Sequence, residues 1–250
     1  MRIVIKVGTQ VIAGKNGLDQ KKMKKLISEI AAVFKRGHEV ILVSSGAIGA
    51  GLPIVTGSSP LRKKIAAAVG QPLLIHDYIH EARKYHIPVG QILILADDFK
   101  NKEHFKSFVT NIEAMLAHEI LPIINENDFM KKEDLDIGDN DSFSAIVAVG
   151  VKADKLIILT NQNGLYTSNP DSDPTATLIK HVTTIDKKIE ALCSTKKSEF
   201  GRGGMITKVR AAKYATKGHV ETLIGNGAEK DIITKALGKE FPGTTFKAKK

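Results

Sequence analysis

Short runs of aliphatic and β-branched residues alternate along this chain with longer segments of helical periodicity. Five such runs occupy residues 2–7, 39–43, 89–95, 120–125 and 155–160. Between the first two, residues 18–34 carry apolar side chains at the spacing of one helix face, and Gly37 suits a C-terminal cap. Strand, helix and strand repeated in this way predict an α/β fold, a parallel sheet with helices on both faces.

The size of the chain suits one large domain. With 250 residues, of which 42% are hydrophobic, there is enough apolar material for a sizeable core. The sequence shows only weak candidate boundaries, near Gly150 and in the polar segment 167–177. Because these boundaries are weak, two lobes of one continuous sheet, roughly residues 1–150 and 151–250, are favoured over two separable domains.

Neither a membrane span nor a secretion signal is indicated. No apolar run approaches the roughly 18 residues that a membrane span needs, and residues 1–8 lack the features of a signal peptide. We therefore expect a cytoplasmic protein. Cys193 is the single cysteine, which excludes an intrachain disulfide and a thiolate metal cluster, and we expect it to pack in or near a helix.

The formal net charge of +10 raises the question of a nucleic-acid surface. Lysines gather within residues 21–25 and 247–250, but aromatic residues make up only 5% of the chain and none interleaves these clusters as a stacking platform would require. A solvated helix face and a frayed tail are therefore favoured. Because a positive field also steers small anionic substrates, such a substrate is a third explanation.

Turns at the carboxyl ends of the strands are the first place to search for a site, because ligands of parallel α/β sheets bind there. The sequence KVGTQ, residues 6–10, places Lys6 and Gly8 at the end of the first strand. The sequence SSGAIGAG, residues 44–51, opens a second turn with small residues, a pattern typical of an anion-binding helix N-terminus. Each turn taken alone also has a purely steric explanation.

A third glycine-rich segment, within residues 199–218, precedes a helical pattern with Lys208 in its first turn. Exposed backbone N–H groups and one lysine at such a helix start can meet a polyphosphate together. Three further cations of this helix are expected in solvent: Arg210, Lys213 and Lys217.

An acidic stretch, INENDFMKKEDLDIGDND at residues 124–141, holds seven carboxylates within this basic chain. Read as a calcium loop from Asp134, it has Asp136 in the third place but Gly138 in the fifth, where an Asp or Asn ligand belongs. A closed metal site is therefore not favoured. The chain also lacks the P-loop, the G-x-G-x-x-G fingerprint, the H-R-D and D-F-G pair, and a G-x-S-x-G elbow.

Six motifs taken together resemble the amino acid kinase family. They are KVGTQ, VSSGAIGAG, NEND at 125–128, GDND at 138–141, LTNQNGLYTSNP at 159–170 and GRGGMITK at 201–208, and they cover nearly the whole chain. Each is weak alone, but NEND followed by GDND is specific. It points to the members that phosphorylate the side-chain carboxylate of L-glutamate.

The resemblance implies a three-layer αβα sandwich around an open, mainly parallel eight-stranded sheet. Glutamate would bind in the N-terminal lobe and ATP in the C-terminal lobe, with Mg²⁺ held mainly through the nucleotide phosphates. The implied reaction is the first step of proline biosynthesis, often under feedback inhibition by proline. A homo-oligomer, dimer or tetramer, is also implied, without nucleic-acid or membrane partners.

Three groups of residues match functional positions of the family. Lys6 and Lys208 match the lysines that hold the phosphates, and Asp141 matches the acid that organises them. The glutamate site is matched by Ser45, Gly46, Ala47, Asn125, Asp128 and Asn140. The nucleotide site is matched by Lys6, Gly8, Thr160, Asn161, Arg202, Gly203, Gly204, Met205 and Lys208, and no protein ligand to a metal is implied.

Three positions depart from the family pattern. Asn161 stands where many relatives have Asp, Arg202 where Thr is usual, and Asp136 where some have Lys, so the details of nucleotide contact stay open. Many relatives also continue into a C-terminal PUA domain similar to RNA-modifying enzymes. This chain ends at Lys250, so we expect the form without that domain.

The charges fit transfer of a phosphoryl group to a carboxylate. A glutamate side chain, with a reference pKa of about 4.3, is ionised at neutral pH and needs no general base. It needs alignment and cancellation of charge. Two lysines, magnesium and N–H groups of the glycine turns would supply the positive side. Asp128, with the two asparagines, can hold the α-ammonium group, while Glu133, Asp134 and Asp136 are expected in a solvated loop.

Two kinds of alternative stay open. Within the family, the acceptor could be acetylglutamate, carbamate or a nucleoside monophosphate. Outside the family, the chain could be a basic nucleic-acid-binding protein, which predicts strongly salt-dependent binding.

Overall fold

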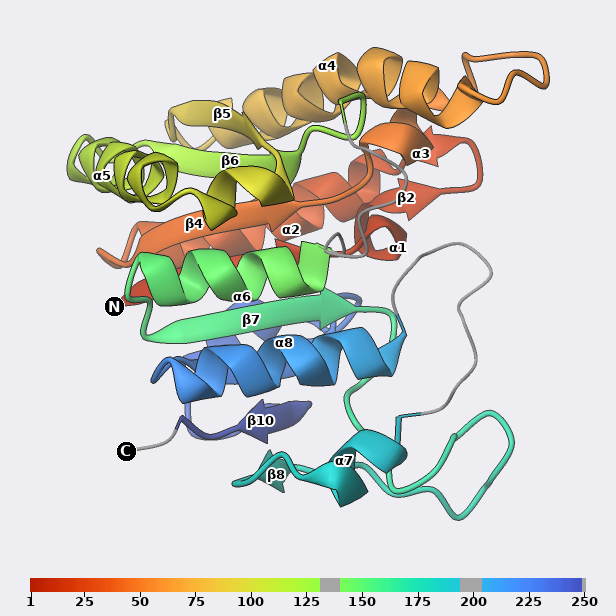
Figure 1. Cartoon of the computed structure of the whole chain (residues 1–250), viewed down its shortest axis with the longest axis vertical. Helices are drawn as coiled ribbons and strands as arrows, with labels where there is room; N and C mark the ends of the chain where they lie inside the picture. The colour runs from red at the N-terminus through yellow and green to blue at the C-terminus, as the bar shows by residue number, and fades with distance from the viewer. Residues whose placement is uncertain (131–139, 194–203, 249–250) are drawn as a thin grey trace. The chain divides into compact units, whose positions relative to one another are not determined.

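The chain forms two compact units in the computed structural model, which describes residues 1–130, 140–193 and 204–248 (Figure 1). One unit consists of residues 7–136. The other combines residues 1–6 with residues 137–250, so the first strand of the chain belongs with its C-terminal half.

Eight strands make up the main sheet. They are β1 (Arg2–Val7), β4 (Glu39–Ser44), β5 (Val89–Ile94), β6 (Leu121–Glu126), β7 (Lys155–Thr160), β8 (His181–Val182), β9 (Glu221–Asn226) and β10 (Thr244–Phe246). Their order along the sheet is β5-β6-β4-β1-β7-β9-β10-β8. The pairs β4–β6, β5–β6, β7–β9 and β8–β10 are parallel, and β10 runs antiparallel to β9. The predicted α/β fold with a mainly parallel eight-stranded sheet and flanking helices is confirmed.

Residues 7–136 place helices on both sides of β4, β5 and β6. Helix α2 (Gln20–Phe34) lies behind these strands in Figure 1, and α5 (Lys102–Ala117) lies in front of them. The unit also contains α1 (Thr9–Ile12), α3 (Ala47–Gly51), α4 (Arg62–Arg83), the 3₁₀ helix η1 (Ala96–Lys100) and the hairpin of β2 (Ala13–Gly14) and β3 (Gly17–Leu18).

Helix α2 begins two residues later than the apolar periodicity predicts. Leu18 belongs to the β2–β3 hairpin, and the carboxylate of Asp19 accepts hydrogen bonds from the N–H groups of Lys21 and Lys22. An Asp at this position satisfies N–H groups that have no partner within the helix, so the cap fixes where the helix starts. At the other end, Gly37 adopts φ +77° and donates to the carbonyl of Phe34, as its predicted role at the end of the helix requires.

A glycine pair lets α3 and α4 approach to backbone contact. A Cβ atom on Gly70 would lie 1.8 Å from the carbonyl oxygen of Ala47, and one on Gly51 would lie 2.0 Å from that of Ala66. Neither position can accept a side chain without moving one of the helices. This contact fixes α4 beside the turn that follows β4.

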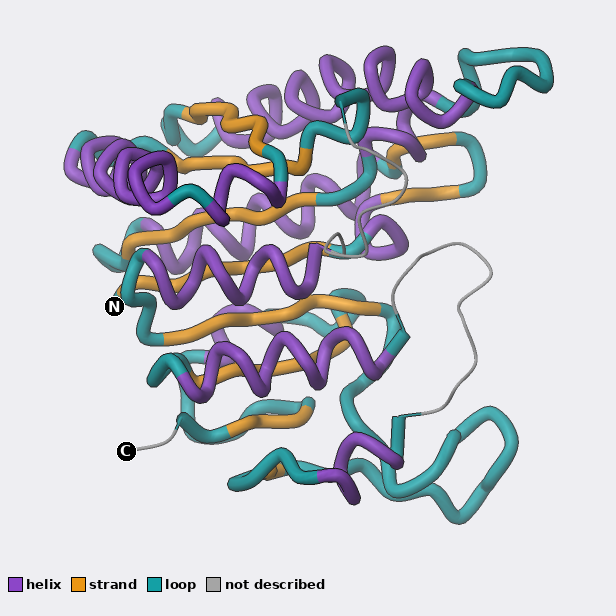
Figure 2. The backbone as a smooth tube through the Cα atoms, in the orientation of Figure 1, coloured by secondary structure: helices purple, strands orange, loops and turns teal. Residues whose placement is uncertain are grey.

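The second unit contains α6 (Asn140–Gly150), α7 (Lys187–Ala191), α8 (Met205–Lys217) and α9 (Ile232–Ala236) (Figure 2). Helices α6 and α8 pack against each other. The strand β7 between residues 155 and 160 is buried from Leu156 onward, which explains its continuous aliphatic sequence.

Cys193 lies just after α7 and is buried, as expected of a packing residue. Burial, together with the charge of Glu190, raises the pKa of its thiol to about 11. Across the described parts of the chain, none of the helices combines the length and the apolar character needed to cross a membrane.

Candidate active site

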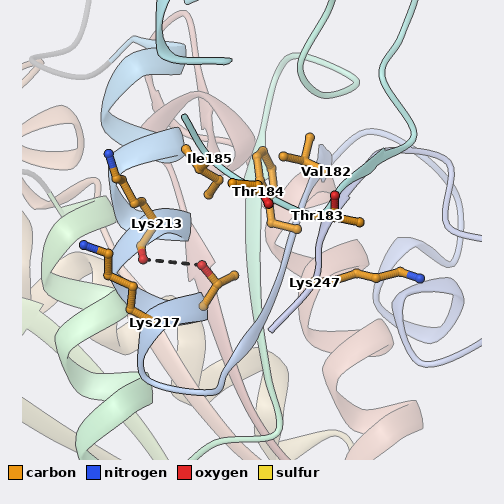
Figure 3. A pocket seen from close by; sticks show the side chains of 9 residues that line it. Val182, Thr183, Thr184, Ile185, Lys213, Lys217 and Lys247 are labelled. Atoms are coloured by element: carbon orange, nitrogen blue, oxygen red, sulfur yellow. Dashed lines mark hydrogen bonds between the residues drawn. The ribbon is translucent and has the colours of Figure 1, made fainter. Parts of the chain in front are cut away.

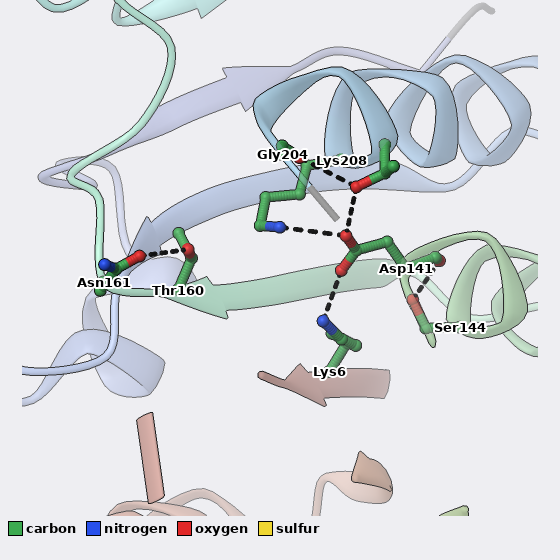
Figure 4. A network of polar contacts seen from close by, with 8 residues as sticks. Lys6, Asp141, Ser144, Thr160, Asn161, Gly204 and Lys208 are labelled. Carbon is green, nitrogen blue, oxygen red and sulfur yellow. Dashed lines mark hydrogen bonds and ion pairs between the residues drawn. The ribbon is translucent and has the colours of Figure 1, made fainter. Parts of the chain in front are cut away.

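Two lysines meet one carboxylate in the interior of the second unit (Figure 4). Lys6 Nζ lies 2.5 Å from Asp141 Oδ1, and Lys208 Nζ lies 3.0 Å from Asp141 Oδ2. The exposed fractions of Lys6, Asp141 and Lys208 are 6%, 2% and 7%. The three predicted catalytic residues therefore form one buried cluster.

Each member of the cluster comes from a different element of that unit. Lys6 is the last but one residue of β1, Asp141 is in the first turn of α6, and Lys208 is the fourth residue of α8. A carboxylate is favoured at a helix N-terminus because it faces the positive end of the macrodipole. Since α6 and α8 pack together, their starts bring Asp141 and Lys208 into contact.

Thr207 adds a hydroxyl to the cluster. Its Oγ1 lies 2.8 Å from Asp141 Oδ2 and 2.9 Å from the carbonyl oxygen of Gly204. A hydroxyl has one hydrogen, and an ionised carboxylate is the stronger acceptor. The hydrogen bond to Asp141 is therefore the favoured one. Thr207 is not among the residues predicted from the sequence, although its place next to Lys208 in the glycine-rich segment is a signal that points to it.

The cluster keeps Asp141 ionised. Burial alone would raise the pKa of this carboxyl, but the charges of Lys6 and Lys208, with the hydrogen bond from Thr207, outweigh it and lower the pKa well below its usual range. The contact with Lys6 is an ion pair and not a well-formed hydrogen bond.

An excess of one positive charge remains in this buried cluster, because two ammonium groups face one carboxylate. Burying an unbalanced charge is costly unless a partner offsets it. The helix α8 starts close by, after Gly204, which has no side chain with which to cap the first N–H groups. The ammonium groups of Lys6 and Lys208 and the N-terminus of the 13-residue helix α8 together form a place suited to a polyphosphate.

The other predicted nucleotide residues of this unit lie at two element ends. Thr160 ends β7, donates its hydroxyl to Asn161 Oδ1 over 3.3 Å, and accepts a hydrogen bond from the N–H of Gly227 at its carbonyl. Asn161 follows the strand and is exposed. Gly204 is the N-cap of α8 and Met205 its first residue, while Arg202 and Gly203 lie outside the described residues.

The turn after β4 carries three of the predicted glutamate residues. Ser45 donates its N–H to the carbonyl of Val7 over 3.2 Å. Gly46 has φ +111°, a conformation that disfavours any side chain, and Ala47 begins α3. Because α3 has only five residues, its macrodipole is small, and any anion would be bound by individual N–H groups of the turn. Gly8 lies at the corresponding place after β1, as the N-cap of α1.

Asn125 and Asp128 lie at the end of β6. Asn125 is 1% exposed, donates its side-chain Nδ2 to Gln71 Oε1 over 2.7 Å, and accepts the N–H of Glu126 at Oδ1 over 3.0 Å. Asp128 is half-buried in the turn that follows, where its N–H donates to the carbonyl of Glu126. Asn140, the first residue of α6, belongs to the other unit, and Asp136 lies outside the described residues.

A small hollow elsewhere in the second unit is lined by none of the predicted site residues (Figure 3). It lies among β8, α8 and β10 and has a volume of about 30 Å³. The amino groups of Lys213, Lys217 and Lys247 point in different directions around it. Lys213 is instead paired with Glu190 over 2.6 Å.

The clustered lysines of α2 are surface residues. Lys21, Lys22 and Lys24 are exposed, and Lys25 pairs with Glu29 over 2.8 Å. Lys22 Nζ also donates to the carbonyl of Ala13. On α8, Arg210 and Lys217 are exposed as expected. These positions agree with a solvated helix face.

Curated relatives match the chain over almost its full length. It is 40% identical over 248 residues to glutamate 5-kinase 2 of Pseudoalteromonas translucida, covering 98% of this chain and 68% of that protein. It is 41% identical over 254 residues to glutamate 5-kinase of Deinococcus radiodurans, with coverage of 99% and 70%. For glutamate 5-kinase of Clostridium acetobutylicum the identity is 40%, with coverage of 98% and 94%. The chain thus spans about two thirds of the length of several relatives and nearly all of another.

Solved structures show the same fold at low identity. Carbamate kinase of Giardia lamblia superposes with a TM-score of 0.70 at 18% identity, and UMP kinase of Ureaplasma parvum with 0.69 at 17%. Each pair covers 98% of both chains. The family-wide pattern of the amino acid kinase family matches residues 1–226. The chain belongs to the amino acid kinase family.

Proposed function

We propose that this chain transfers the γ-phosphoryl group of ATP to the side-chain carboxylate of L-glutamate. A carboxylate oxygen attacks the γ-phosphorus, the bond between that phosphorus and the β,γ-bridging oxygen breaks, and ADP leaves with the electron pair. The product is glutamate 5-phosphate. The observation that carries the proposal is the buried cluster of Lys6, Asp141 and Lys208. The identity of about 40% to curated glutamate 5-kinases supports the choice of acceptor.

Lys6 and Lys208 would stabilise the charge on the oxygens of the transferred group. The attacking carboxylate is already ionised at neutral pH, so the chain does not have to remove a proton. It has to bring two anions together, and most of the catalysis of phosphoryl transfer comes from positioning and electrostatic stabilisation. Buried cations are effective because water screens them little.

Asp141 and Thr207 would hold the two cations in place. Both carboxylate oxygens of Asp141 are engaged, one by Lys6 and the other by Lys208 and Thr207. Charges that are fixed before the reaction need no reorganisation during it. In this role Asp141 acts through the lysines and does not react itself.

The donor set fits a nucleotide polyphosphate. Ammonium groups and backbone N–H groups bind anionic oxygens, and a magnesium ion would be held mainly by the phosphates, where it neutralises their charge. Within residues 1–130, 140–193 and 204–248, no group of three or more His, Cys, Asp or Glu side chains could hold a metal ion. We propose Thr160, Asn161, Arg202, Gly203, Gly204 and Met205 as further nucleotide contacts, together with Gly8, which follows Lys6 by two residues.

The amino acid would be recognised by polar groups at the ends of β4 and β6. Asp128 supplies a charge opposite to that of the α-ammonium group, and Asn125 supplies an amide. We also propose Asn140, the first residue of α6, as a substrate-binding residue. The N–H groups of Gly46 and Ala47 suit a carboxylate. Because the N–H of Ser45 is bonded to the carbonyl of Val7, Ser45 would contribute its side-chain hydroxyl. We further propose a cytoplasmic homo-oligomer in proline biosynthesis, with proline as a feedback inhibitor.

A hydroxylamine trap tests the proposal. An acyl phosphate reacts with hydroxylamine to give a hydroxamate, whereas a phosphomonoester or phosphoanhydride does not. The purified chain with ATP and Mg²⁺ should form hydroxamate with L-glutamate, and much less with D-glutamate, aspartate or acetylglutamate. Preference for acetylglutamate, carbamate or a nucleoside monophosphate as the phosphoryl acceptor would instead select another activity of the family.

A further inference from the structure

We infer that Gln71, on α4, is a positioning residue that orients the amide of Asn125 toward the amino-acid acceptor. The inference rests on the proposed function, because it assigns Asn125 to the acceptor site. Gln71 is half-buried and its Oε1 lies 2.7 Å from Asn125 Nδ2.

The hydrogen bonds of Asn125 define which way its amide points. The N–H of Glu126 donates to Asn125 Oδ1, so that side of the amide is the oxygen. The Nδ2 group therefore faces Gln71, whose oxygen accepts one of its two hydrogens. Rotating the amide by half a turn would place two donors against each other at Glu126 and two acceptors against each other at Gln71. The N–H of Glu126 thus selects one of the two orientations, and Gln71 Oε1 holds the amide in it.

The contact between α3 and α4 fixes the backbone that carries Gln71. Gly70, the preceding residue, touches the backbone of Ala47 and Gly51 so closely that no side chain fits. The position of Gln71 is therefore set against the same turn that contains Ser45 to Ala47.

A second hydrogen bond joins the same side of α4 to the end of β4. Ser44 Oγ donates to the carbonyl of Ser45 over 2.9 Å, so the hydroxyl of Tyr78 is the donor in its 2.8 Å contact with Ser44 Oγ. Tyr78 follows Gln71 by seven residues, which is about two helical turns. Helix α4 thus reaches the ends of both strands that carry the proposed acceptor residues.

The consequence for function is specific to the acceptor. Gln71 acts through Asn125, so its loss should weaken binding of glutamate and leave binding of ATP unchanged. Replacing Gln71 by Leu removes the acceptor and leaves a buried amide hydrogen without its partner. The expected rise in the KM for glutamate is about tenfold.

Two further variants separate positioning from general damage. Gln71→Glu keeps an acceptor oxygen for Asn125 and should recover most of the lost affinity. Gln20→Leu is a matched control, because Gln20 also binds a side chain of α4, donating Nε2 to Asp77 over 2.7 Å, but it is exposed and touches no proposed site residue. It should leave both KM values unchanged.

The experiment measures the KM for glutamate and for ATP in these variants and in Asn125→Ala with and without Gln71→Leu. We expect Gln71→Leu to raise only the glutamate KM and to add little once Asn125 is Ala. A glutamate KM unchanged in Gln71→Leu, or equal rises in both KM values, overturns the inference. If the unaltered chain forms no glutamyl hydroxamate at all, the proposed function fails first, and the acceptor role of Gln71 fails with it.

Discussion

Thr207 donates its hydroxyl hydrogen to Asp141 Oδ2 over 2.8 Å and so joins the first turn of α8 to the first turn of α6. Lys208 contacts the same oxygen, 3.0 Å away. Thr207 holds Asp141 in place, and Asp141 in turn holds Lys208. Thr207 and Lys208 are consecutive residues. A change at Thr207 should therefore alter the position of the Lys208 ammonium group through Asp141, without direct contact between the side chains of Thr207 and Lys208.

Replacing Thr207 tests this coupling. Thr207→Val keeps the shape but removes the donor, and a hydrogen bond to a charged group is worth about 1.5–3 kcal/mol. We expect kcat to fall about tenfold or more, with the KM for glutamate little changed. Thr207→Ser restores the hydroxyl and should restore most of kcat. A fall in kcat in Thr207→Ser with near-normal kcat in Thr207→Val would mean that packing of the methyl group, not the hydrogen bond, matters.

The two lysines should be needed for turnover and not for folding. Lys6→Ala and Lys208→Ala should each lower kcat about a hundredfold or more, as loss of a preorganised charge typically does. Lys213→Ala is the matched control on α8, because Lys213 is paired with Glu190 at the surface. Near-normal kcat in Lys6→Ala or Lys208→Ala would remove that lysine from the proposed mechanism.

Asp141 should affect kcat rather than the affinity for glutamate. Asp141→Asn keeps the shape but removes the charge between two cations. Because the three residues would act as a unit, Asp141→Asn combined with Lys208→Ala should cost much less than the product of the single losses. Steady-state kinetics of the singles and the double provide the measurement, with circular dichroism as a check of folding. Multiplicative losses would show that Asp141 and Lys208 act independently.

Acid should erase the contribution of Asp141 to stability. A carboxyl whose pKa is lowered in the folded state stabilises that state above its unfolded pKa of about 3.9, and the stabilisation is lost as the pH falls toward the folded pKa. Asp141→Asn should thus be less stable than the unaltered chain at pH 7, by about 3 kcal/mol or more. The difference between the denaturant midpoints of Asp141→Asn and of the unaltered chain should begin to shrink below about pH 4. A constant difference from pH 7 to pH 3 would contradict the ion-pair account.

Asp128 should matter for the amino acid alone. A carboxylate that faces the α-ammonium group contacts glutamate and not ATP, so Asp128→Ala should raise the KM for glutamate far more than that for ATP. The ATP value in the same variant serves as the control. Comparable rises in both values would remove Asp128 from the acceptor site.

The sequence was sufficient for the fold class because the longer strands are continuous aliphatic runs. Strands β1 and β7 have the bounds that these runs predict, and β4, β5 and β6 differ from them by one residue. Strand β9 was missed because Thr222 and Gly225 interrupt its aliphatic pattern. Strands β8 and β10 have only two and three residues, too few for a periodic signal.

Site residues could be predicted where they stand in motifs that follow strands. Contacts between residues far apart in the sequence were less predictable. Lys6, Asp141 and Lys208 stand in recognisable motifs, and the structure brings them together. Thr207 and Asp141 are 66 residues apart, and Gln71 and Asn125 are 54 apart. Such pairs depend on how α8 packs on α6 and how α4 packs on α3. No local pattern in one sequence contains that information.

The origin of one oxygen atom tests the central claim most directly. L-Glutamate labelled with ¹⁸O in its side-chain carboxylate is incubated with the chain, ATP and Mg²⁺, and the product is allowed to cyclise, when its amino group attacks the carbonyl carbon and releases phosphate. If a carboxylate oxygen attacks the γ-phosphorus, the released phosphate carries one ¹⁸O atom, which ³¹P NMR detects. Phosphate without ¹⁸O would mean that water is the acceptor, and would contradict the account.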